Sequence, residues 1–240
     1  MLACGCYHRI PAQPIDASAG PDVAGDTKTR DSGLADAPPP SILLMNYISD
    51  FWNDTGAAMT LQYPGPQQAH DLNIVVVGWI NTHSIAQIYD DAGNSYTAAG
   101  QADLNGMHQK LYFACDILAT TGNVVHVTLD SSAQSDLRIL EFSGIATTSC
   151  EDQIAASVGN ATTDSSGSVT TTQAHELLFA TNTSIGTTTG GDPTFAHAFL
   201  DTWPDVLEYE EVFATGTYKA TATQESVNDW VMQIVSFRGQ

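Results

Sequence analysis

From residue 41 to the C-terminus, short stretches rich in Val, Ile, Thr, Phe and Tyr alternate apolar with polar side chains and are separated by turn-forming residues. No window of roughly 11 or more residues sustains the 3.6-residue repeat of an amphipathic helix. Successive side chains of a strand point to opposite faces, so this period predicts β-strands. The expected strands are Ile42–Ile48, Ala58–Tyr63, Asp71–Ile80, Ser84–Tyr89, Ser95–Ala98, His108–Asp116, Asn123–Leu129, Asp136–Phe142, Ser166–Thr171, Glu176–Thr181, Val206–Phe213, Gly216–Thr223 and Asp229–Phe237.

About a dozen strands in one domain suit two packed antiparallel sheets better than a small barrel. We therefore expect an all-β, two-sheet antiparallel β-sandwich over residues 41–240. Residues 7–40 are dominated by Pro, Ala, Asp, Gly and Ser, which cannot bury enough apolar area to offset the entropy of ordering. The prediction for residues 1–40 is a remnant of a lipoprotein signal followed by a disordered tether.

The 240 residues include 27 acidic and only 7 basic side chains, and the formal net charge is −20. A chain this acidic is repelled by nucleic acids and by anionic bilayers, so nucleic-acid binding and peripheral membrane roles are excluded. No run approaches the roughly 18 apolar residues of a spanning helix. Any contact with a membrane is expected only through a lipid anchor.

Such an anchor is suggested by the start of the chain, Met1-Leu2-Ala3-Cys4-Gly5-Cys6. A bacterial lipoprotein signal ends in Leu, two small residues and the Cys that is lipidated, and Cys6 and Cys4 each fit this tail. The basic and apolar regions that precede such a signal are missing, so either the start site is placed too late or the match is accidental. The predicted location is the bacterial cell envelope or the secreted fraction.

Five segments carry a resemblance, in this order: Asp71–Trp79, Tyr89–Tyr96, Leu111–Ile117, Asp136–Gly144 and Asp229–Phe237. Together they resemble a β-sandwich module of bacterial secreted and surface proteins that has no assigned function. The resemblance implies a jelly-roll or concanavalin-like fold over residues 41–240 and an extracytoplasmic location. It brings no catalytic motif and no cofactor.

Two cysteines lie within the predicted domain, Cys115 and Cys150. In an oxidising compartment they could close a loop of about 35 residues, a link worth about 3–4 kcal/mol in the chain-entropy model. The alternative is a buried free Cys115 with an exposed Cys150. The spacing of the cysteines and of the seven histidines fits no structural zinc site.

The sequence holds no clear catalytic arrangement, and no catalytic residue is predicted. The GxSxG motif of serine hydrolases is absent. Glycoside hydrolysis needs two carboxyl groups, and Glu141 together with Glu208, Glu210 or Glu211 would supply them. The alternative is that Arg138, Arg238 or the backbone neutralises Glu141.

The segment Asp90-Asp91-Ala92-Gly93-Asn94 offers oxygen ligands on a short loop. Extracellular sandwiches often stiffen such loops with weakly bound Ca²⁺, so Asp90, Asp91 and Asn94 are the candidate metal ligands. The alternative is a hairpin loop held by Asx hydrogen bonds, with Gly93 and Asn94 at positive φ. Calcium is the only cofactor that the sequence suggests.

Trp203 lies in a predicted loop between Asp201 and Asp205, which makes it the best candidate for an exposed platform that stacks on a sugar ring. Trp79 is a second candidate, although its apolar strand also suits a core position. The leading hypothesis is a non-catalytic binding module for a glycan or a surface protein. The alternatives are a carbohydrate-active enzyme on a jelly-roll scaffold and a structural surface subunit without a ligand. A groove with Trp79 or Trp203 near two carboxylates about 5–10 Å apart would favour the enzyme, and a flat face without such a pair would favour binding.

Overall fold

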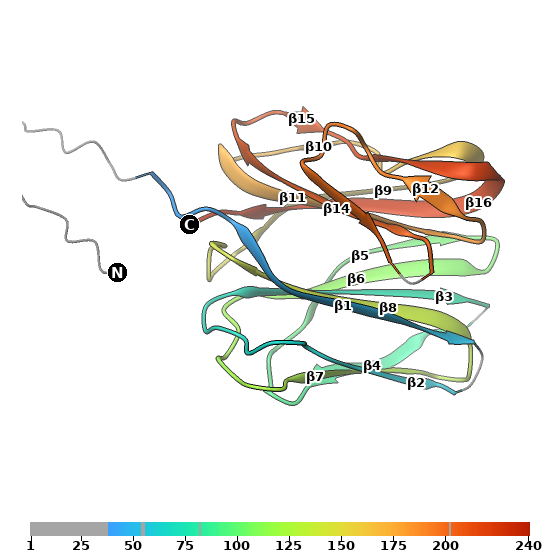
Figure 1. Cartoon of the computed structure of the whole chain (residues 1–240), viewed down its shortest axis with the longest axis horizontal. Helices are drawn as coiled ribbons and strands as arrows, with labels where there is room; N and C mark the ends of the chain where they lie inside the picture. The colour runs from blue at the N-terminus through green and yellow to red at the C-terminus, as the bar shows by residue number, and fades with distance from the viewer. Residues whose placement is uncertain (1–37, 54–55, 82, 202) are drawn as a thin grey trace, which may run out of the picture. The chain divides into compact units, whose positions relative to one another are not determined.

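The computed structural model describes residues 38–53, 56–81, 83–201 and 203–240. These residues form antiparallel β-strands and no helix, as the alternating sequence predicts. The strands make four sheets, which lie in layers in Figure 1. The predictions for the tether and for Cys4 and Cys6 fall on residues outside the described part of the chain.

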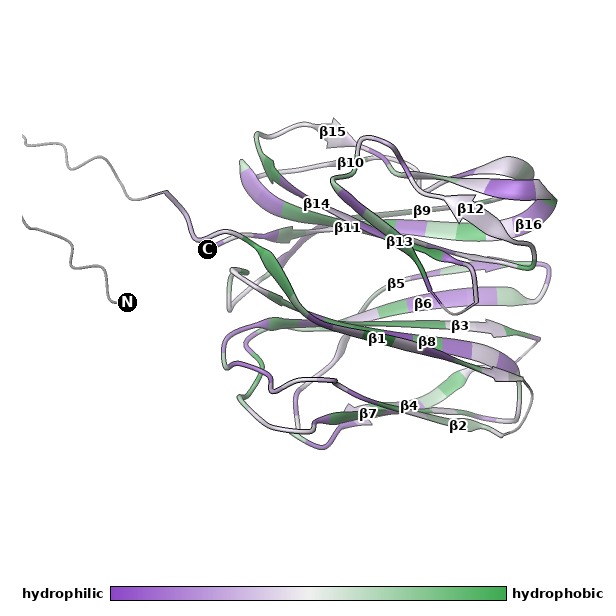
Figure 2. Ribbon diagram, viewed as in Figure 1, coloured by the Kyte–Doolittle hydropathy of each residue, from purple (hydrophilic) through white to green (hydrophobic). Residues whose placement is uncertain are grey.

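The central sheet has five strands in the order β1-β8-β3-β6-β5, and it is buried on both faces. In β3, Ile74 and Val76 point to one face, whereas Val75 and Val77 point to the other. This double burial explains why β3 reads as a continuous apolar run, which Figure 2 also shows. The strands are β1 (Leu43–Asn53), β8 (Gln134–Ser143), β3 (Leu72–Ile80), β6 (Met107–Ala114) and β5 (Thr97–Leu104).

A three-stranded sheet, β2-β7-β4, covers one face of the central sheet. Met59 and Leu61 of β2 and Val125 and Val127 of β7 pack against the central strands there. One face of β7 is buried and the other is half-buried, so its sequence alternates clearly. The strands are β2 (Ala58–Gln62), β7 (Val124–Leu129) and β4 (Ile85–Asp90).

A six-stranded sheet covers the opposite face of the central sheet. Phe142 of the central sheet meets Phe179 and Tyr209 of the six-stranded sheet edge to face. Its order is β12-β16-β11-β14-β13, with β9 also paired to β16. The strands are β12 (Thr188–Gly190), β16 (Thr221–Arg238), β11 (His175–Ser184), β14 (Val206–Phe213), β13 (His197–Leu200) and β9 (Glu151–Ser165).

The outer face of the six-stranded sheet holds a third apolar cluster, which includes Leu178, Met232 and Ile234. The fourth sheet pairs only β10 (Val169–Thr170) with β15 (Thr217–Tyr218), and Val169 packs into this cluster. The domain therefore has apolar layers on both sides of each of its two largest sheets.

The structure differs from the expected strand list at several points. No strand is predicted between 143 and 166, yet β9 runs through 15 residues there. Its Ala, Ser, Gly, Asn and Thr residues give little apolar contrast, because most of them are exposed or half-buried. The two strands expected over 216–223 and 229–237 are largely one long strand, β16.

The predicted hairpin at residues 90–94 is wrong, although the turn itself is present with Gly93 at φ 79°. The strand before it, β4, pairs with β7, whereas the strand after it, β5, pairs with β6 in a different sheet. The turn therefore connects two layers. The positive φ predicted for Gly93 is confirmed and the one predicted for Asn94 is not. Local turn chemistry does not determine which strands pair.

Cys115 and Cys150 form a disulfide, with Cα atoms 6.3 Å apart. Cys115 follows β6 of the central sheet and Cys150 precedes β9 of the six-stranded sheet. Both contact the apolar cluster between the two sheets. The disulfide therefore joins these sheets at one end, and it is consistent with an oxidising, extracytoplasmic compartment.

The two largest sheets meet along one pair of edges and leave the other pair more open. On the first side β5 contacts β9, so closely that a Cβ added at Gly100 would overlap Ile154. On the second side the edge strands are β1 and β13, where Tyr47 meets Phe199 with ring centroids 4.7 Å apart. The groove and cavity described below border this second edge.

Candidate functional site

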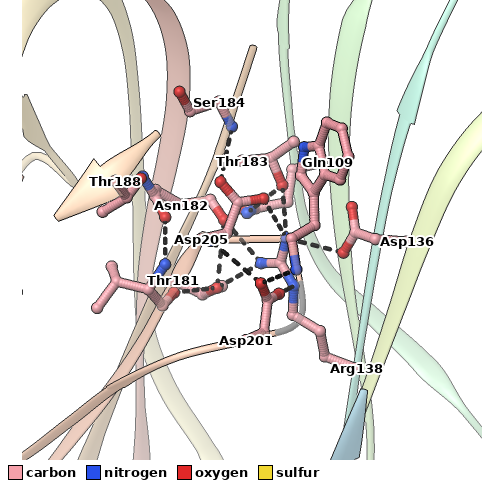
Figure 3. A network of polar contacts seen from close by, with 12 residues as sticks. Gln109, Asp136, Arg138, Thr181, Asn182, Thr183, Ser184, Thr188, Asp201 and Asp205 are labelled. Atoms are coloured by element: carbon pink, nitrogen blue, oxygen red, sulfur yellow. Dashed lines mark hydrogen bonds and ion pairs between the residues drawn. The ribbon is translucent and has the colours of Figure 1, made fainter. Parts of the chain in front are cut away.

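The candidate site is built around Arg138 of β8, whose side chain is 0% exposed. Strand alternation places Arg138 on the same face as Leu140 and Phe142, between the two largest sheets. Its Nη1 donates hydrogen bonds to Thr181 Oγ1 at 2.8 Å and to the carbonyl oxygen of Asn182 at 2.7 Å (Figure 3). The guanidinium thus binds β11 of the opposite sheet.

Three carboxylates surround the same guanidinium. Nη2 lies 2.7 Å from Asp136 Oδ2 and 2.6 Å from Asp205 Oδ2, and Nε lies 2.6 Å from Asp201 Oδ2. Three acids around one base leave an excess of negative charge in a buried place. The carboxylates in turn hold the Arg138 pKa above its usual range, although burial alone would lower it.

Burial raises the pKa of Asp136 to about 6, with Arg138 opposing the shift and Asp201 reinforcing it. Burial also raises the pKa of Asp205 well above its usual range, again against the effect of Arg138. The cluster therefore holds its negative charge at a free-energy cost, and a further positive charge nearby would reduce that cost.

Asp201 and Asp205 also fix the loop that carries Trp203. Asp201 Oδ1 accepts the main-chain N–H groups of Trp203 at 2.9 Å and of Asp205 at 3.1 Å. Asp205 Oδ1 accepts the N–H of Ser184 at 3.0 Å. The two acids on either side of Trp203 therefore hold the loop against Arg138 and β11, and their carboxylates do not form an exposed surface beside the indole.

Trp203 stacks on Phe51 of β1, with ring centroids 4.0 Å apart and an angle of 8° between the planes. Trp203 is 37% exposed, whereas Trp79 is only 2% exposed. Of the two tryptophans considered from the sequence, Trp203 has a surface that a ligand can reach. Trp79 packs in the core beneath the three-stranded sheet, and its indole N–H donates to the carbonyl of His83.

A small cavity of about 20 Å³ lies beside this stacked pair. A volume of that size holds about one water-sized group. Phe51, Asp136 and Gly78 occupy neighbouring positions across β1, β8 and β3 at this point. The cavity is lined by Phe51, Gly78, Trp79, Ile80, Gln134, Ser135, Asp136, Thr183, Ser184 and Trp203.

An open groove of about 460 Å³ runs beside the same edge, between β1 and the end of β13. Tyr47, Ile48 and Ser49 line one side, and Leu200 and Asp201 line the other. The Asp201 side chain is 2% exposed. The groove is therefore mainly apolar and hydroxylic. Its lining residues are close in sequence to Phe51 on β1 and to Trp203 in the loop after β13.

The structure thus brings Trp203, Asp201, Asp205 and Trp79 into one region, but in different roles. Sequence reasoning missed Asp136, Phe51 and Gly78, and it gave Arg138 the wrong partner. The available signal was the alternation of β8, which places the charged residues Asp136 and Arg138 on a face that otherwise carries Leu140 and Phe142. A buried base on such a face requires buried acids.

Glu141 lies on the opposite face of β8 from Arg138, so Arg138 does not neutralise it, and none of the glutamates of β14 is among its hydrogen-bond partners. Its carboxylate accepts hydrogen bonds from the side chain of Asn46 and from the N–H of Gln68. It also neighbours Asp71, whose pKa rises to about 7 through burial and through Glu141. Arg238, the other proposed partner, pairs with Asp152.

The remaining glutamates considered as catalytic partners lie on β14 and have other contacts. Glu208 accepts the N–H of Asp192 at 2.6 Å, and Glu210 accepts the N–H of Ala196. Glu211 binds His175 at 2.8 Å and the N–H of Ile42 at 2.9 Å. Each of these carboxylates has a local structural partner.

The candidate calcium ligands diverge. Asp90 accepts four hydrogen bonds, from the N–H and the side-chain amide of Asn94, from the Tyr96 hydroxyl and from the Asn123 amide. Asp91 instead lies 2.8 Å from His126. Asp90 and Asn94 are thus brought together as an Asx turn, and Asp91 points to another strand.

Among the described residues, three or more acid, histidine or cysteine side chains come close enough to share a metal ion only at Asp136, Asp201 and Asp205. Arg138 contacts all three, so a guanidinium occupies the place that a cation would take. In the same part of the chain, no helix is long and apolar enough to cross a bilayer.

Comparison of the chain with protein-family models, with curated proteins and with solved structures finds no match. The assignment of a function therefore depends on the geometry of this region.

Proposed function

We propose that this domain is a non-catalytic glycan-binding module that acts outside the cytoplasm. The observation that carries the proposal is the stacked pair Phe51–Trp203, which presents a partly exposed indole next to an open groove. A flat aromatic ring suits the apolar face of a pyranose, and a ring that is already stacked loses little freedom on binding.

The groove extends this platform along the edge of the domain. Its lining of Tyr47, Ile48, Ser49 and Leu200 combines apolar surface with hydroxyl groups, the mixture that binds the two kinds of surface on a sugar. Its volume of about 460 Å³ is in the range of small-molecule sites. An open groove also allows a polymer to continue past both ends.

A carbohydrate-active enzyme is the second candidate, because carboxylates do gather beside Trp203. The oxygens of Asp136, Asp201 and Asp205 lie within 4.8 Å of one another. Glycoside hydrolysis, however, needs two carboxyl groups on either side of the scissile bond. Here all three contact Arg138, and of the three only Asp136 lines the cavity, so binding is the better-supported function.

The finer fold and the location are part of this proposal. The central and six-stranded sheets would be the two halves of a jelly-roll or concanavalin-like sandwich, to which the other two sheets are additions. The disulfide supports export to an oxidising compartment. Lipidation of Cys6 or Cys4 would then keep the domain at the cell envelope.

The test is a glycan-array and polysaccharide pull-down screen with the purified full-length protein, with and without calcium. We expect at least one polysaccharide to bind, and Trp203→Ala to weaken that binding at least tenfold. Tyr89→Ala is the matched control, because Tyr89 is also an exposed ring stacked on a neighbour, His126, at 4.5 Å. A blank screen, or equal losses in the two variants, would refute the proposal, and capture of a protein in place of a glycan would replace it.

A further inference from the structure

Residue 78, which lines the cavity beside Phe51 and Trp203, is glycine. A Cβ at this position would overlap Asp136 Oδ1 and would lie 2.9 Å from Thr183 Oγ1. These two oxygens therefore reach over the glycine backbone. Asp136 and Thr183 line the cavity together with the aromatic residues Phe51, Trp79 and Trp203.

Asp136 supplies the charge of this cavity. Asp136 is only 5% exposed, and its Oδ2 pairs with Arg138 (Figure 3). Its Oδ1 lies over Gly78. Behind Asp136 lie Asp201 and Asp205, so three carboxyl groups share one guanidinium. Burial raises the pKa of Asp205 well above its usual range, and Asp136, the one acid of the three that lines the cavity, is the group that would meet a bound cation.

The size and lining of the cavity decide which cation fits. About 20 Å³ accepts a group of one heavy atom and excludes a sugar ring. Calcium requires six to eight oxygen ligands, and of the three acids only Asp136 lines the cavity. A primary ammonium needs a few oxygen acceptors and is also attracted to the faces of aromatic rings such as Phe51 and Trp203.

We infer that this cavity binds the ammonium group of an amino sugar, and that the glycan recognised on Trp203 contains glucosamine units with free amino groups. This inference rests on the proposed glycan-binding function. Phe51 and Trp203 border both the exposed platform and the cavity, so a sugar stacked on the platform has the ammonium pocket within reach of a ring substituent. An N-acetyl group in the same position is too large for the cavity and carries no charge.

The elevated pKa of Asp136 agrees with this assignment. Burial raises this pKa to about 6, so the carboxylate is ionised at neutral pH but lacks a full complement of stabilising partners. A bound ammonium would supply one of them. Binding of the amino sugar should therefore weaken as the pH falls through 6, because Asp136 takes up a proton instead.

The experiment measures binding of three hexasaccharides of equal length to the full-length protein by calorimetry: one of glucosamine, one of N-acetylglucosamine and one of glucose. The wild type is expected to bind the glucosamine hexamer at least tenfold more tightly than the other two. Because the protein is strongly acidic, each titration is repeated at high salt, where screening removes long-range attraction to a polycation.

Two variants separate charge from shape. Asp136→Asn removes the charge and keeps the size, whereas Gly78→Ala keeps the charge and displaces Asp136 Oδ1 from its place beside the cavity. In each variant, the affinity for the glucosamine hexamer is expected to fall until it equals the affinity of the same variant for the N-acetylglucosamine hexamer. Glu225→Gln is the matched control, because it removes an exposed carboxylate outside this region and should preserve the tenfold preference.

The outcomes distinguish this inference from the proposed function. Equal binding of all three hexamers, with loss in Trp203→Ala, would overturn the ammonium pocket and leave glycan binding intact. A preference that survives in both Asp136→Asn and Gly78→Ala would also overturn it. If no hexamer binds and a lysine-rich peptide binds in a manner that depends on Asp136, both the ammonium pocket and the glycan-binding function are refuted, and the ligand is a protein.

Discussion

Asp201 links Trp203 to the interior of the domain: one carboxylate oxygen accepts the indole residue's main-chain N–H at 2.9 Å, and the other lies 2.6 Å from Arg138 Nε. An exposed ring on a loop is thereby fixed to a buried guanidinium. The position of the proposed platform depends on a charge cluster in the interior.

Replacement of Arg138 by Met should destabilise the fold strongly. The substitution leaves Asp136, Asp201 and Asp205 buried without their cation, and loss of one partner from a buried charge cluster costs about 3–5 kcal/mol. Urea unfolding followed by tryptophan fluorescence measures the change. Arg238→Met, which removes a more exposed arginine near Asp152, should cost less, and equal costs would contradict this account.

Stability should fall as the pH rises from about 4.5 to 8, in part because of Glu208. Burial raises the pKa of this group from 4.5 to about 8, with the N–H of Asp192 partly opposing the shift. The folded state therefore binds a proton that the unfolded state has released in this range, so that stability is lost as pH increases. Thermal unfolding across this range measures the slope.

Glu208→Gln should reduce this slope and stabilise the protein at pH 8 and above, because the neutral amide needs no proton. The gain is of the order of a few kcal/mol, since one pKa unit corresponds to about 1.4 kcal/mol. Glu225→Gln, at an exposed position, is the control and should leave the slope unchanged. The assignment to Glu208 fails if the two variants have the same pH profile.

Removal of calcium should leave the melting temperature unchanged. The Asp90 carboxylate accepts four hydrogen bonds from Asn94, Tyr96 and Asn123, so its oxygens are already used. Asp90→Ala should cost about 1–3 kcal/mol in the presence of a chelator, because it leaves buried donors unpaired. If a chelator lowers the melting temperature of the wild type and Asp91→Asn abolishes that effect, the calcium hypothesis is correct instead.

Reduction of the Cys115–Cys150 disulfide should lower stability by about 3–4 kcal/mol, as expected for a closed loop of about 35 residues. Unfolding curves with and without a reductant measure the loss. Alkylation and mass spectrometry of the protein from the native cell should find both cysteines protected, together with a lipid on Cys6 or Cys4. A cytosolic protein with Met1 intact and both body cysteines alkylated would refute the envelope assignment.

The all-β class could be predicted because burial in a strand with one buried face follows a two-residue period, and that period is visible in β2, in β7 and in the first half of β6. The number of layers could not be predicted from the sequence. A strand buried on both faces, such as β3, shows only that it is central, and the sequence does not say which sheets cover it. The pairing of β4 with β7 likewise depends on contacts between segments distant in sequence.

Of the candidate-site residues, the exposed Trp203 could be predicted from the sequence, because a Trp that lies between two acids in a loop is seldom a core residue. The function of those acids was not predictable, since their partner Arg138 comes from a strand more than sixty residues away in the sequence. The cavity was also hidden, because its lining comes from four strands, β1, β3, β8 and β11, and from the loop of Trp203.

The pairing of the strands also has a consequence for how the chain folds. β1, the first strand of the described part, pairs with β8, and β16, the last, pairs with β9, β11 and β12. The six-stranded sheet therefore cannot form until the residues of β16 have been synthesised. Such a topology of distant partners folds slowly, because long loops must close before the strands can pair.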